Sequence, residues 1–174
     1  MKIKNGLLVV ILIAFIGVLA LQIFMLTEKQ QAYIDIIRVF NEFKLKKELS
    51  TKLEDIQLKR TEKLDSLKIR YQAALVEFEK KDKKEANVRE IELIRQEYII
   101  KEQQFKEDNE NMSAQYNDQV WTQLNAYLKE YGEKSGYEFI FGANGQGSLI
   151  YAKKDKEITD DVIKFVNNKY DGMK

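Results

Sequence analysis

The side chains that most often carry out chemistry in proteins are few in this sequence. It contains neither histidine nor cysteine, so thiolate and imidazole groups are missing as nucleophiles, general bases and metal ligands. The acids near the predicted sheet are Asp35, Asp155, Asp160 and Asp161, and nothing in their spacing places two carboxylates across a pocket. Asp160 and Asp161 also suit the first turn of a helix, where acids complement the helix dipole. We therefore predict no enzymatic activity, no metal site and no cofactor.

A glycine-rich segment, residues 142–147, invites comparison with a phosphate-binding loop. A P-loop has a lysine and a serine or threonine after its last glycine, and it joins a strand to a helix. Here Ser148 follows the last glycine directly, and the segment is predicted to join two strands. We interpret it as a turn. The net charge of +1 also gives no general reason to expect nucleic-acid binding.

A cluster of basic residues is the first candidate binding site. It consists of Lys80, Lys81, Lys83, Lys84 and Arg89. The simplest interpretation is a solvated helix end. The functional alternative is a contact point for acidic partners or anionic lipid headgroups, which basic clusters attract.

A sparse set of apolar residues is the second candidate. Leu58, Ile69 and Val76 are spaced by eleven and seven residues, which places them on one face of a helix. Leu93 and Ile100 are spaced by seven on a second predicted helix. We assign this set to contact with an unfolded client protein, with packing against another subunit and scattered surface positions as the alternatives.

Both candidates lie in one long charged segment, residues 39–131, which has no proline and no glycine. Its apolar residues recur at spacings of three and four, the pattern of a helix with one buried stripe. The pattern stops between Phe78 and Ile91. The residues of the stripe are Leu45, Leu49, Leu53, Ile56, Leu64, Leu67, Tyr71, Leu75 and Phe78, then Ile91, Ile94, Tyr98, Phe105, Met112, Tyr116, Val120 and Leu124.

The two halves of this segment mirror each other. Their apolar residues stand at matching distances from residues 84–85, as in the pairs Phe78 with Ile91 and Leu49 with Val120. Facing antiparallel helices rise equally per residue, so this symmetry predicts an antiparallel coiled-coil hairpin with its tip near 84–85. The alternative is a single continuous helix, which would have to absorb a phase slip between the two halves.

The N-terminal segment, residues 1–27, predicts insertion into a membrane. Residues 7–26 are almost entirely apolar, about the length that crosses a bilayer as a helix. Lys2 and Lys4 precede them and should stay in the cytoplasm, so the rest of the chain is expected outside it. We favour an uncleaved signal anchor over a cleaved signal peptide, because the apolar run continues past the small residues that could mark a cleavage site.

Short strands are predicted on both sides of the long segment, at residues 32–37, 136–141 and 148–152, which are rich in β-branched and aromatic types. The last two should form a β-hairpin across the glycine-rich turn. Gly132 is expected to end the second long helix, and Thr159 is expected to cap a final helix over residues 160–170.

The predicted fold class is therefore α+β and mainly α. Residues 28–174 form one domain, in which the coiled-coil hairpin of residues 39–131 projects from a small β body with a C-terminal helix. The body takes residues 32–38 and 136–174, which the closure of the hairpin brings together.

Three groups of residues carry a resemblance to a known family. They are Tyr33-Ile34-Asp35 with Val39-Phe40, then the sequence GYEFIFGAN at residues 136–144, and the sequence ITDDVI at residues 158–163. Their order and spacing around a long helical hairpin resemble the OmpH-like family of periplasmic chaperones for outer-membrane proteins. The resemblance covers essentially everything after residue 31.

This resemblance implies a homotrimer in which the strands of all copies form a shared β-barrel, with the hairpins hanging from it as arms. It also implies an ATP-independent holdase that binds unfolded outer-membrane proteins in the periplasm and prevents their aggregation. The residues expected in the oligomer body are Ile34, Ile36, Phe139, Phe141, Leu149, Ile150 and Tyr151.

Two features depart from the family pattern. The N-terminal segment looks uncleaved, so we expect a periplasmic protein tethered to the inner membrane, with a cleaved and soluble form as second choice. The hairpin is about neutral, whereas the family's arms are strongly basic, so attraction of clients by charge should be weaker. The alternative function is a membrane-anchored coiled-coil scaffold or stalk of the cell envelope, which would favour a continuous helix.

Overall fold

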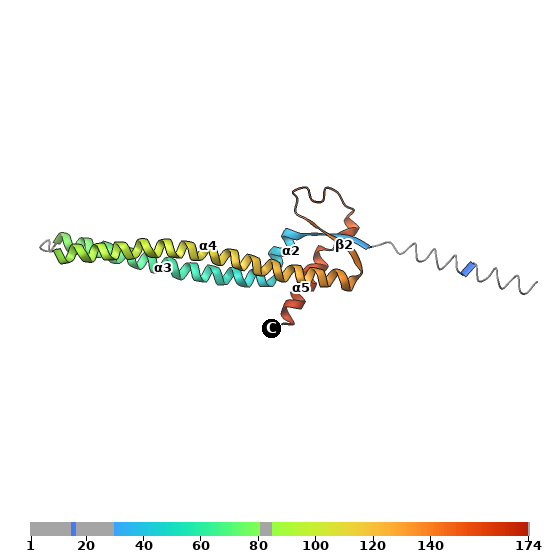
Figure 1. Ribbon diagram of the computed structural model, residues 1–174, viewed down its shortest axis with the longest axis horizontal. Helices are drawn as coiled ribbons and strands as arrows, with labels where there is room; N and C mark the ends of the chain where they lie inside the picture. The colour runs from blue at the N-terminus through green and yellow to red at the C-terminus, as the bar shows by residue number, and fades with distance from the viewer. Residues whose placement is uncertain (1–14, 17–29, 81–84, 174) are drawn as a thin grey trace, which may run out of the picture.

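The computed structural model describes residues 15–16, 30–80 and 85–173, and it has one long two-helix arm that projects from a small body (Figure 1). The elements after the N-terminal segment are strand β1 (Gln30–Asp35), helices α2 (Ile36–Glu42), α3 (Lys44–Lys80) and α4 (Glu85–Ser135), strand β2 (Tyr137–Ala143), the 3-10 turn η1 (Lys154–Lys156) and helix α5 (Thr159–Asp171).

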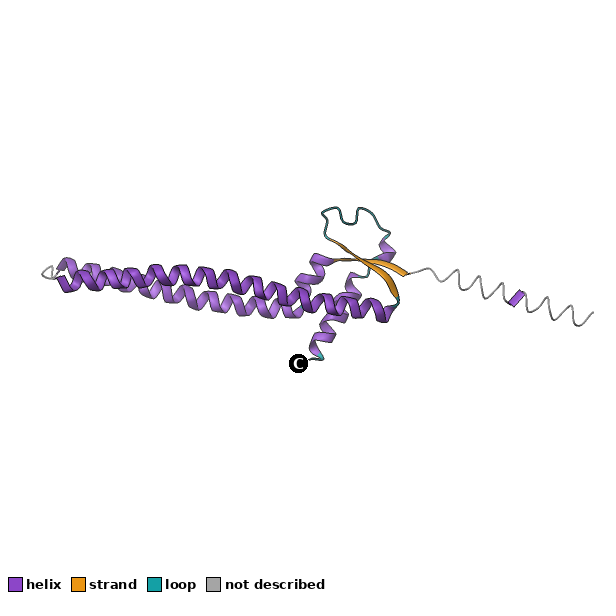
Figure 2. Cartoon of the chain, viewed as in Figure 1, coloured by secondary structure: helices purple, strands orange, loops and turns teal. Residues whose placement is uncertain are grey.

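The arm is an antiparallel hairpin in which α3 and α4 lie side by side (Figure 2). α3 has 37 residues, which corresponds to a reach of about 55 Å at 1.5 Å per residue. Ion pairs cross the seam at the levels that the sequence symmetry predicts, between Arg60 and Asp108 and between Arg70 and Glu97. The hairpin prediction is confirmed, and the alternative of one continuous helix is wrong.

A break at Phe43 separates α2 from α3, where the sequence predicts one helix from residue 39 onward. Phe43 has extended backbone angles (φ −68°, ψ 127°) and its side chain is fully buried in the body. The side-chain amide of Asn167 on α5 bridges the break. Its Nδ2 donates to the carbonyl of Glu42 at 3.2 Å, and its Oδ1 accepts from the backbone N–H of Lys44 at 2.8 Å. The break therefore leaves these two backbone groups hydrogen-bonded while the ring enters the core.

The second long helix ends at Ser135, before Gly136, and the prediction that it ends at Gly132 is wrong. Gly136 has a φ of +72°, a left-handed conformation that glycine adopts readily and that commonly follows a helix. Gly132 lies within α4 and serves packing instead. A Cβ atom at that position would lie 3.4 Å from Cδ1 of Ile140, where β2 crosses the helix.

The sheet consists of β1 and β2, which pair in parallel although the whole arm separates them in sequence. Tyr33 is opposite Phe141, and Ile34 is opposite Gly142. The face that carries Ile34 joins a core to which every long helix and α5 contribute. The buried residues of this core are Ala32, Ile34, Val39, Phe43, Leu45, Val120, Leu124, Tyr127, Ile158, Val162 and Val166.

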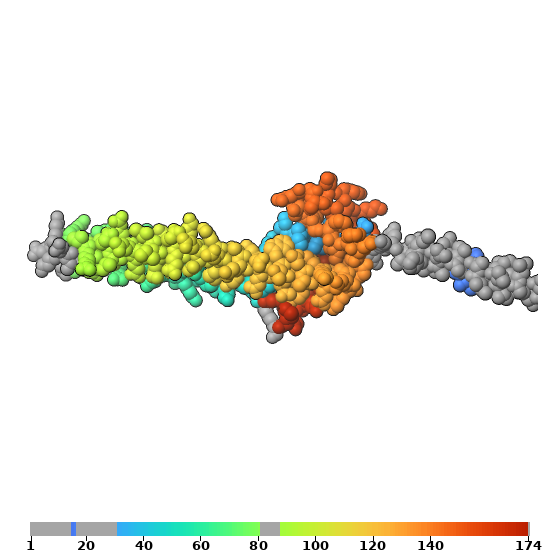
Figure 3. All heavy atoms as spheres, viewed as in Figure 1, coloured from blue at the N-terminus to red at the C-terminus, as the bar shows by residue number. Residues whose placement is uncertain are grey.

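The third predicted strand, residues 148–152, does not form in the single chain. Residues 144–153 project from the body as a loop (Figure 3), and Ile150 within it is 93% exposed. Gly145 and Gly147 have φ values of +72° and +95°, a conformation that glycine adopts readily, and within the described residues the sheet consists of β1 and β2 without a strand after this turn. The predicted β-hairpin is wrong for one copy, because the segment has no neighbouring strand with which to pair.

Helix α5 begins at Thr159, which is its first residue rather than its predicted cap. Ile158 occupies the cap position, and Thr159 is 1% exposed. The Thr159 hydroxyl accepts a hydrogen bond from the backbone N–H of Asp35 at 2.9 Å and donates one to Glu157 at 3.0 Å. Thr159 therefore joins α5 to the end of β1.

Within residues 15–16, 30–80 and 85–173, none of the helices has both the length and the apolar character needed to cross a membrane. The predicted membrane segment at residues 1–27 lies outside the described residues, except for Phe15 and Ile16.

Candidate functional site

The predicted apolar set lies on the surface of the arm. Leu58, Ile69, Val76, Leu93 and Ile100 are between 49% and 66% exposed. None of them therefore belongs to the seam between α3 and α4. Their assignment to client contact stays a prediction.

On α3 the apolar residues face directly away from α4. Leu67 is 2% exposed and marks the seam side of this helix. Ile69 follows it by two residues and Val76 by nine, which at about 100° per residue places both near the opposite side. They line a shallow hollow together with Ala73, and every residue that lines this hollow belongs to α3.

On α4 the apolar residues occupy a different face. Ile94 is 2% exposed and marks the seam side. Leu93 precedes it by one residue and Ile100 follows it by six, so both lie about 100–120° away from the seam. The structure therefore separates the predicted set into two surfaces. We name Ile69 and Val76 the α3 stripe, and Leu93 and Ile100 the α4 stripe.

Three further exposed apolar residues on α4 were not predicted. Val88 is 51% exposed, Ile99 is 52% exposed and Trp121 is 37% exposed. Ile99 lines a second hollow, of about 300 Å³, between Tyr71 of α3 and Tyr98 of α4. The signal in the sequence was the pair Ile99-Ile100, because two consecutive apolar residues on a helix cannot both face a narrow seam.

The basic cluster is only partly described. Lys80 is the last residue of α3 and Arg89 lies near the start of α4, and both are exposed. Lys81, Lys83 and Lys84 lie outside the described residues. The role of the cluster as a binding point stays a prediction.

A layer of polar side chains, which was not predicted, interrupts the apolar seam between α3 and α4 in the middle of the arm. The Arg60 side chain is only 18% exposed, and it bonds Asn109 and, at 3.3 Å, Asp108 across the seam. Its guanidinium group also lies over the ring of Phe105. The signal was the gap in the predicted stripe between Ile56 and Leu64, because Arg60 is four residues from each.

The outer face of the sheet carries uncovered aromatic rings. Phe139 is 51% exposed and Phe141 is 46% exposed, and their rings stack with centroids 6.0 Å apart. Tyr33, opposite Phe141, lies on the same face, and burial together with the nearby Glu157 raises the pKa of its phenol. In the loop, Leu149 is half-buried, and Tyr151 is 81% exposed.

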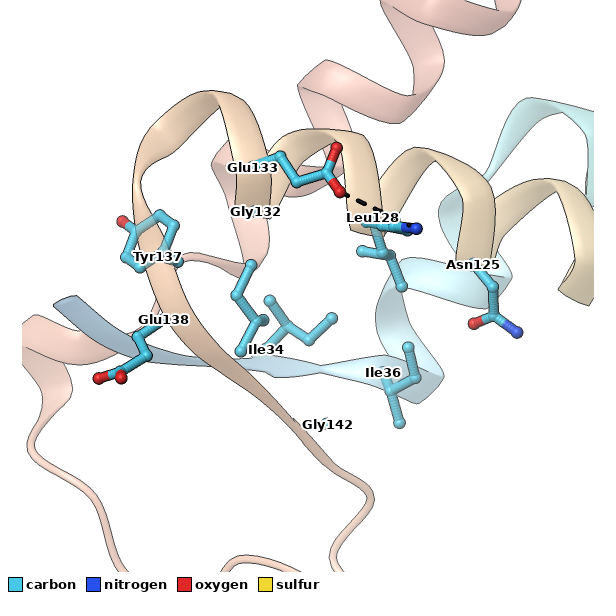
Figure 4. Close-up of a pocket in the computed structure, with 11 residues that line it drawn as sticks. Ile34, Ile36, Asn125, Leu128, Gly132, Glu133, Tyr137, Glu138 and Gly142 are labelled. Atoms are coloured by element: carbon cyan, nitrogen blue, oxygen red, sulfur yellow. Dashed lines mark ion pairs between the residues drawn. The ribbon is translucent and has the colours of Figure 1, made fainter. Parts of the chain in front are cut away.

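The inner face of the sheet packs on α4 around a hollow of about 440 Å³ (Figure 4). Ile34 and Ile36 line this hollow together with Leu128 of α4. Ile34 is 2% exposed, so this predicted oligomer residue lies in the core of its own chain. The polar rim holds an ion pair between Lys129 and Glu133 at 3.9 Å.

Charged groups fasten α5 to the rest of the body. Glu130 of α4 bonds Lys134 on its own helix at 2.7 Å and Lys169 of α5 at 2.8 Å. These hydrogen bonds lower the pKa of the Glu130 carboxyl. Arg38 of α2 bonds Asp160 of α5 in the same manner. These contacts fix the body from which the arm projects.

A small α/β body with one long two-helix arm and exposed apolar faces defines the class of tentacle-bearing coiled-coil proteins. The chain belongs to the OmpH-like outer membrane protein family, whose family model matches residues 30–166. This confirms the resemblance found in the sequence, and the family is one of periplasmic chaperones for outer-membrane proteins. A search of curated protein sequences finds no match to the chain.

Proposed function

We propose that this protein is an ATP-independent holdase that binds unfolded outer-membrane proteins in the periplasm and keeps them from aggregating. The observation that carries the proposal is the arm itself: it is long and narrow, and it exposes apolar residues on two faces outside its seam. Family membership supplies the class of client.

The exposed apolar residues suit weak and distributed binding. Each of them offers one side chain to a client, and none lies in an enclosed pocket. Many small contacts on linked arms give avidity through a high effective concentration, and each contact can be released without ATP. Shielding of exposed apolar segments suppresses aggregation, which is the main hazard for an unfolded β-barrel chain.

The proposed oligomer is a homotrimer built through the sheet. Phe139 and Phe141 leave an aromatic face uncovered, and Ile150 and Tyr151 extend from the loop with almost full exposure. Solvent exposure of so many large apolar side chains is unfavourable, and burial against the same groups of other copies would remove it. In such an assembly residues 148–152 would gain the strand partner that they lack in one chain.

The proposed location is the periplasm, with residues 1–27 as an uncleaved tether to the inner membrane and a cleaved, soluble form as second choice. The chain would then hold clients close to the membrane from which they emerge. The mature N-terminus, measured by mass spectrometry, decides between the two forms.

The alternative function is a membrane-anchored scaffold or stalk, for which a single continuous helix would be expected. The observed hairpin counts against it, because α4 packs along α3 and returns the chain to the body.

The test uses residues 28–174 and an unfolded β-barrel membrane protein that is diluted from urea. Light scattering of the client should rise much more slowly in the presence of the protein, with or without ATP. An equal mass of an inert protein is the control. Unchanged aggregation of the client would contradict the proposal.

A further inference from the structure

The α3 stripe and the α4 stripe share three properties. The two residues of each stripe are seven apart, which is the repeat of a left-handed coiled coil. Each stripe is exposed, at 49–66% for its residues. Between the ends of each stripe the residues on the side away from the seam are uncharged, Gln72 and Ala73 on α3 and Gln96 on α4, and the charged Glu97 on the seam side of the α4 stripe pairs with Arg70 at 4.0 Å.

The stripes also lie at one level of the arm. Val76 and Leu93 are equally distant from the centre of the sequence symmetry at residues 84–85, and so are Ile69 and Ile100. They face different directions, however, since the α3 stripe is opposite the seam and the α4 stripe lies about 100–120° from it. One hairpin cannot bring its own two stripes together, but two hairpins side by side can.

Charge defines the inner end of both stripes. One heptad closer to the body the same two faces carry Glu62 on α3 and Glu107 on α4, and both residues are exposed. Two glutamates at one level would repel each other across a contact between copies. An apolar contact is therefore favoured only over the outer part of the arm.

We propose that, in the empty assembly, the α3 stripe of each copy packs against the α4 stripe of the next copy and closes the arms near their tips. This inference rests on the proposed homo-oligomer, and it names a second copy of this chain as the occupant of both stripes. Val76 meets Leu93 of the neighbour, and Ile69 meets Ile100. Below this contact the glutamates hold the arms apart and leave space for a client.

The size of the contact fits a reversible closure. Four side chains bury far less than the roughly 1,200 Å² that a stable interface between free proteins needs. The body tethers the arms to one another, and tethering supplies an effective concentration on the order of millimolar. An unfolded client that offers apolar side chains to the same stripes competes with the closure, so binding of the client opens the arms.

The test exploits the absence of cysteine from the full chain. The double variant Val76→Cys/Leu93→Cys is oxidised under mild conditions and run on a non-reducing gel. A disulfide within one chain is excluded, because both side chains turn away from a seam between helices about 8–10 Å apart. The inference predicts covalent oligomers for most of the protein and at least a several-fold decrease when unfolded β-barrel client is added first.

The matched control is Asp55→Cys/Ala114→Cys, which lies three heptads closer to the body on the same two faces, with both residues exposed. It should yield far fewer covalent oligomers. The variant Ile69→Cys/Ile100→Cys probes the second contact. It also replaces Val76→Cys/Leu93→Cys in the test if Val76→Cys/Leu93→Cys loses its helical circular dichroism.

Light scattering and the client aggregation assay accompany the cross-linking. An oligomer that suppresses aggregation but cross-links no better than the control overturns the closure and leaves the holdase intact. If added client does not reduce the cross-linking, then client and closure do not compete for the stripes, and that part of the proposal is overturned. A monomeric mass overturns both the closure and the proposed oligomer.

Discussion

The backbone N–H of Lys44 donates a hydrogen bond to Oδ1 of Asn167 at 2.8 Å, which links the first residue of the arm to the C-terminal helix. The side-chain amide of Asn167 also donates to the carbonyl of Glu42, so one side chain holds both sides of the break between α2 and α3. We expect Asn167→Leu to lower the free energy of unfolding by about 1–2 kcal/mol, because it removes both hydrogen bonds and each contributes about 1 kcal/mol. Urea unfolding followed by circular dichroism measures the change, and the exposed neighbour Asn168 provides the control variant Asn168→Leu. Equal stability of the two variants would contradict a bridging role.

The arm could be predicted from the sequence because its signal is repeated at every turn. Most apolar residues of the stripe from Leu45 to Phe78 have a counterpart on the second helix, so one position without a counterpart, such as Leu67, does not destroy the pattern. The same redundancy identified the exposed apolar set, since residues that break the seam periodicity must face elsewhere, but it did not show that the set is divided between two faces.

Element ends could not be predicted because they depend on partners that are distant in sequence. Gly132 and Gly136 look equally suitable as helix ends, and only the passage of Ile140 across the helix assigns Gly132 to packing. Thr159 looks like a helix cap until β1 brings the N–H of Asp35 to its hydroxyl. Residues 148–152 have the composition of a strand, but a strand also needs a neighbouring strand with which to pair, and composition does not show whether one is present.

Arg60 supplies a prediction for the middle of the arm. Its charge occupies a seam position between Ile56 and Leu64, and the loss of hydration offsets much of what its bonds to Asp108 and Asn109 contribute. Asp108 itself keeps contact with water at 43% exposure. We therefore expect Arg60→Leu to raise the free energy of unfolding by about 1 kcal/mol through apolar packing in the seam.

Thermal unfolding measures this effect, with Arg70→Leu as the control because its side chain is 60% exposed and its pair with Glu97 is long, at 4.0 Å. A strong loss of stability in Arg60→Leu alone would mean that the polar layer stabilises the arm.

Glu130 predicts a dependence of stability on pH. Its hydrogen bonds to Lys134 and Lys169 lower its pKa in the folded state. A lowered pKa means that the ionised carboxylate stabilises the fold above the ordinary glutamate pKa of about 4.3 and that this contribution disappears as the pH falls through the folded pKa. Between about pH 5 and pH 3 the wild type should therefore lose stability more steeply than Glu130→Gln.

Urea midpoints across this pH range test the prediction. Glu133→Gln is the control, because the pair of Glu133 with Lys129 is longer, at 3.9 Å, and does not join α4 to α5. Identical pH profiles for wild type and Glu130→Gln would exclude the contribution.

The stripes predict which substitutions weaken the hold on a client. Replacement of Ile69, Val76, Leu93 and Ile100 together by serine removes apolar surface that is already exposed, so helicity should change little. Client aggregation should accelerate at least several-fold relative to wild type. Serine at the exposed positions Asp55, Lys63, Gln104 and Gln115 is the matched control. A loss of circular dichroism in the first variant alone would assign the stripes to the fold of the arm.

The aromatic face and the loop predict the strength of the oligomer. Phe141 is 46% exposed and Ile150 is 93% exposed in one chain, so their truncation costs the isolated fold little. In a shared body both side chains become core residues, and loss of a large core side chain costs about 2–5 kcal/mol. Phe141→Ala/Ile150→Ala should therefore dissociate the assembly into folded monomers, whereas Ile37→Ala, at an exposed position on α2, should not. Light scattering gives the mass and circular dichroism the fold. An unchanged mass would contradict assembly through the sheet, because only an assembly built on another surface would keep its mass after both side chains are removed.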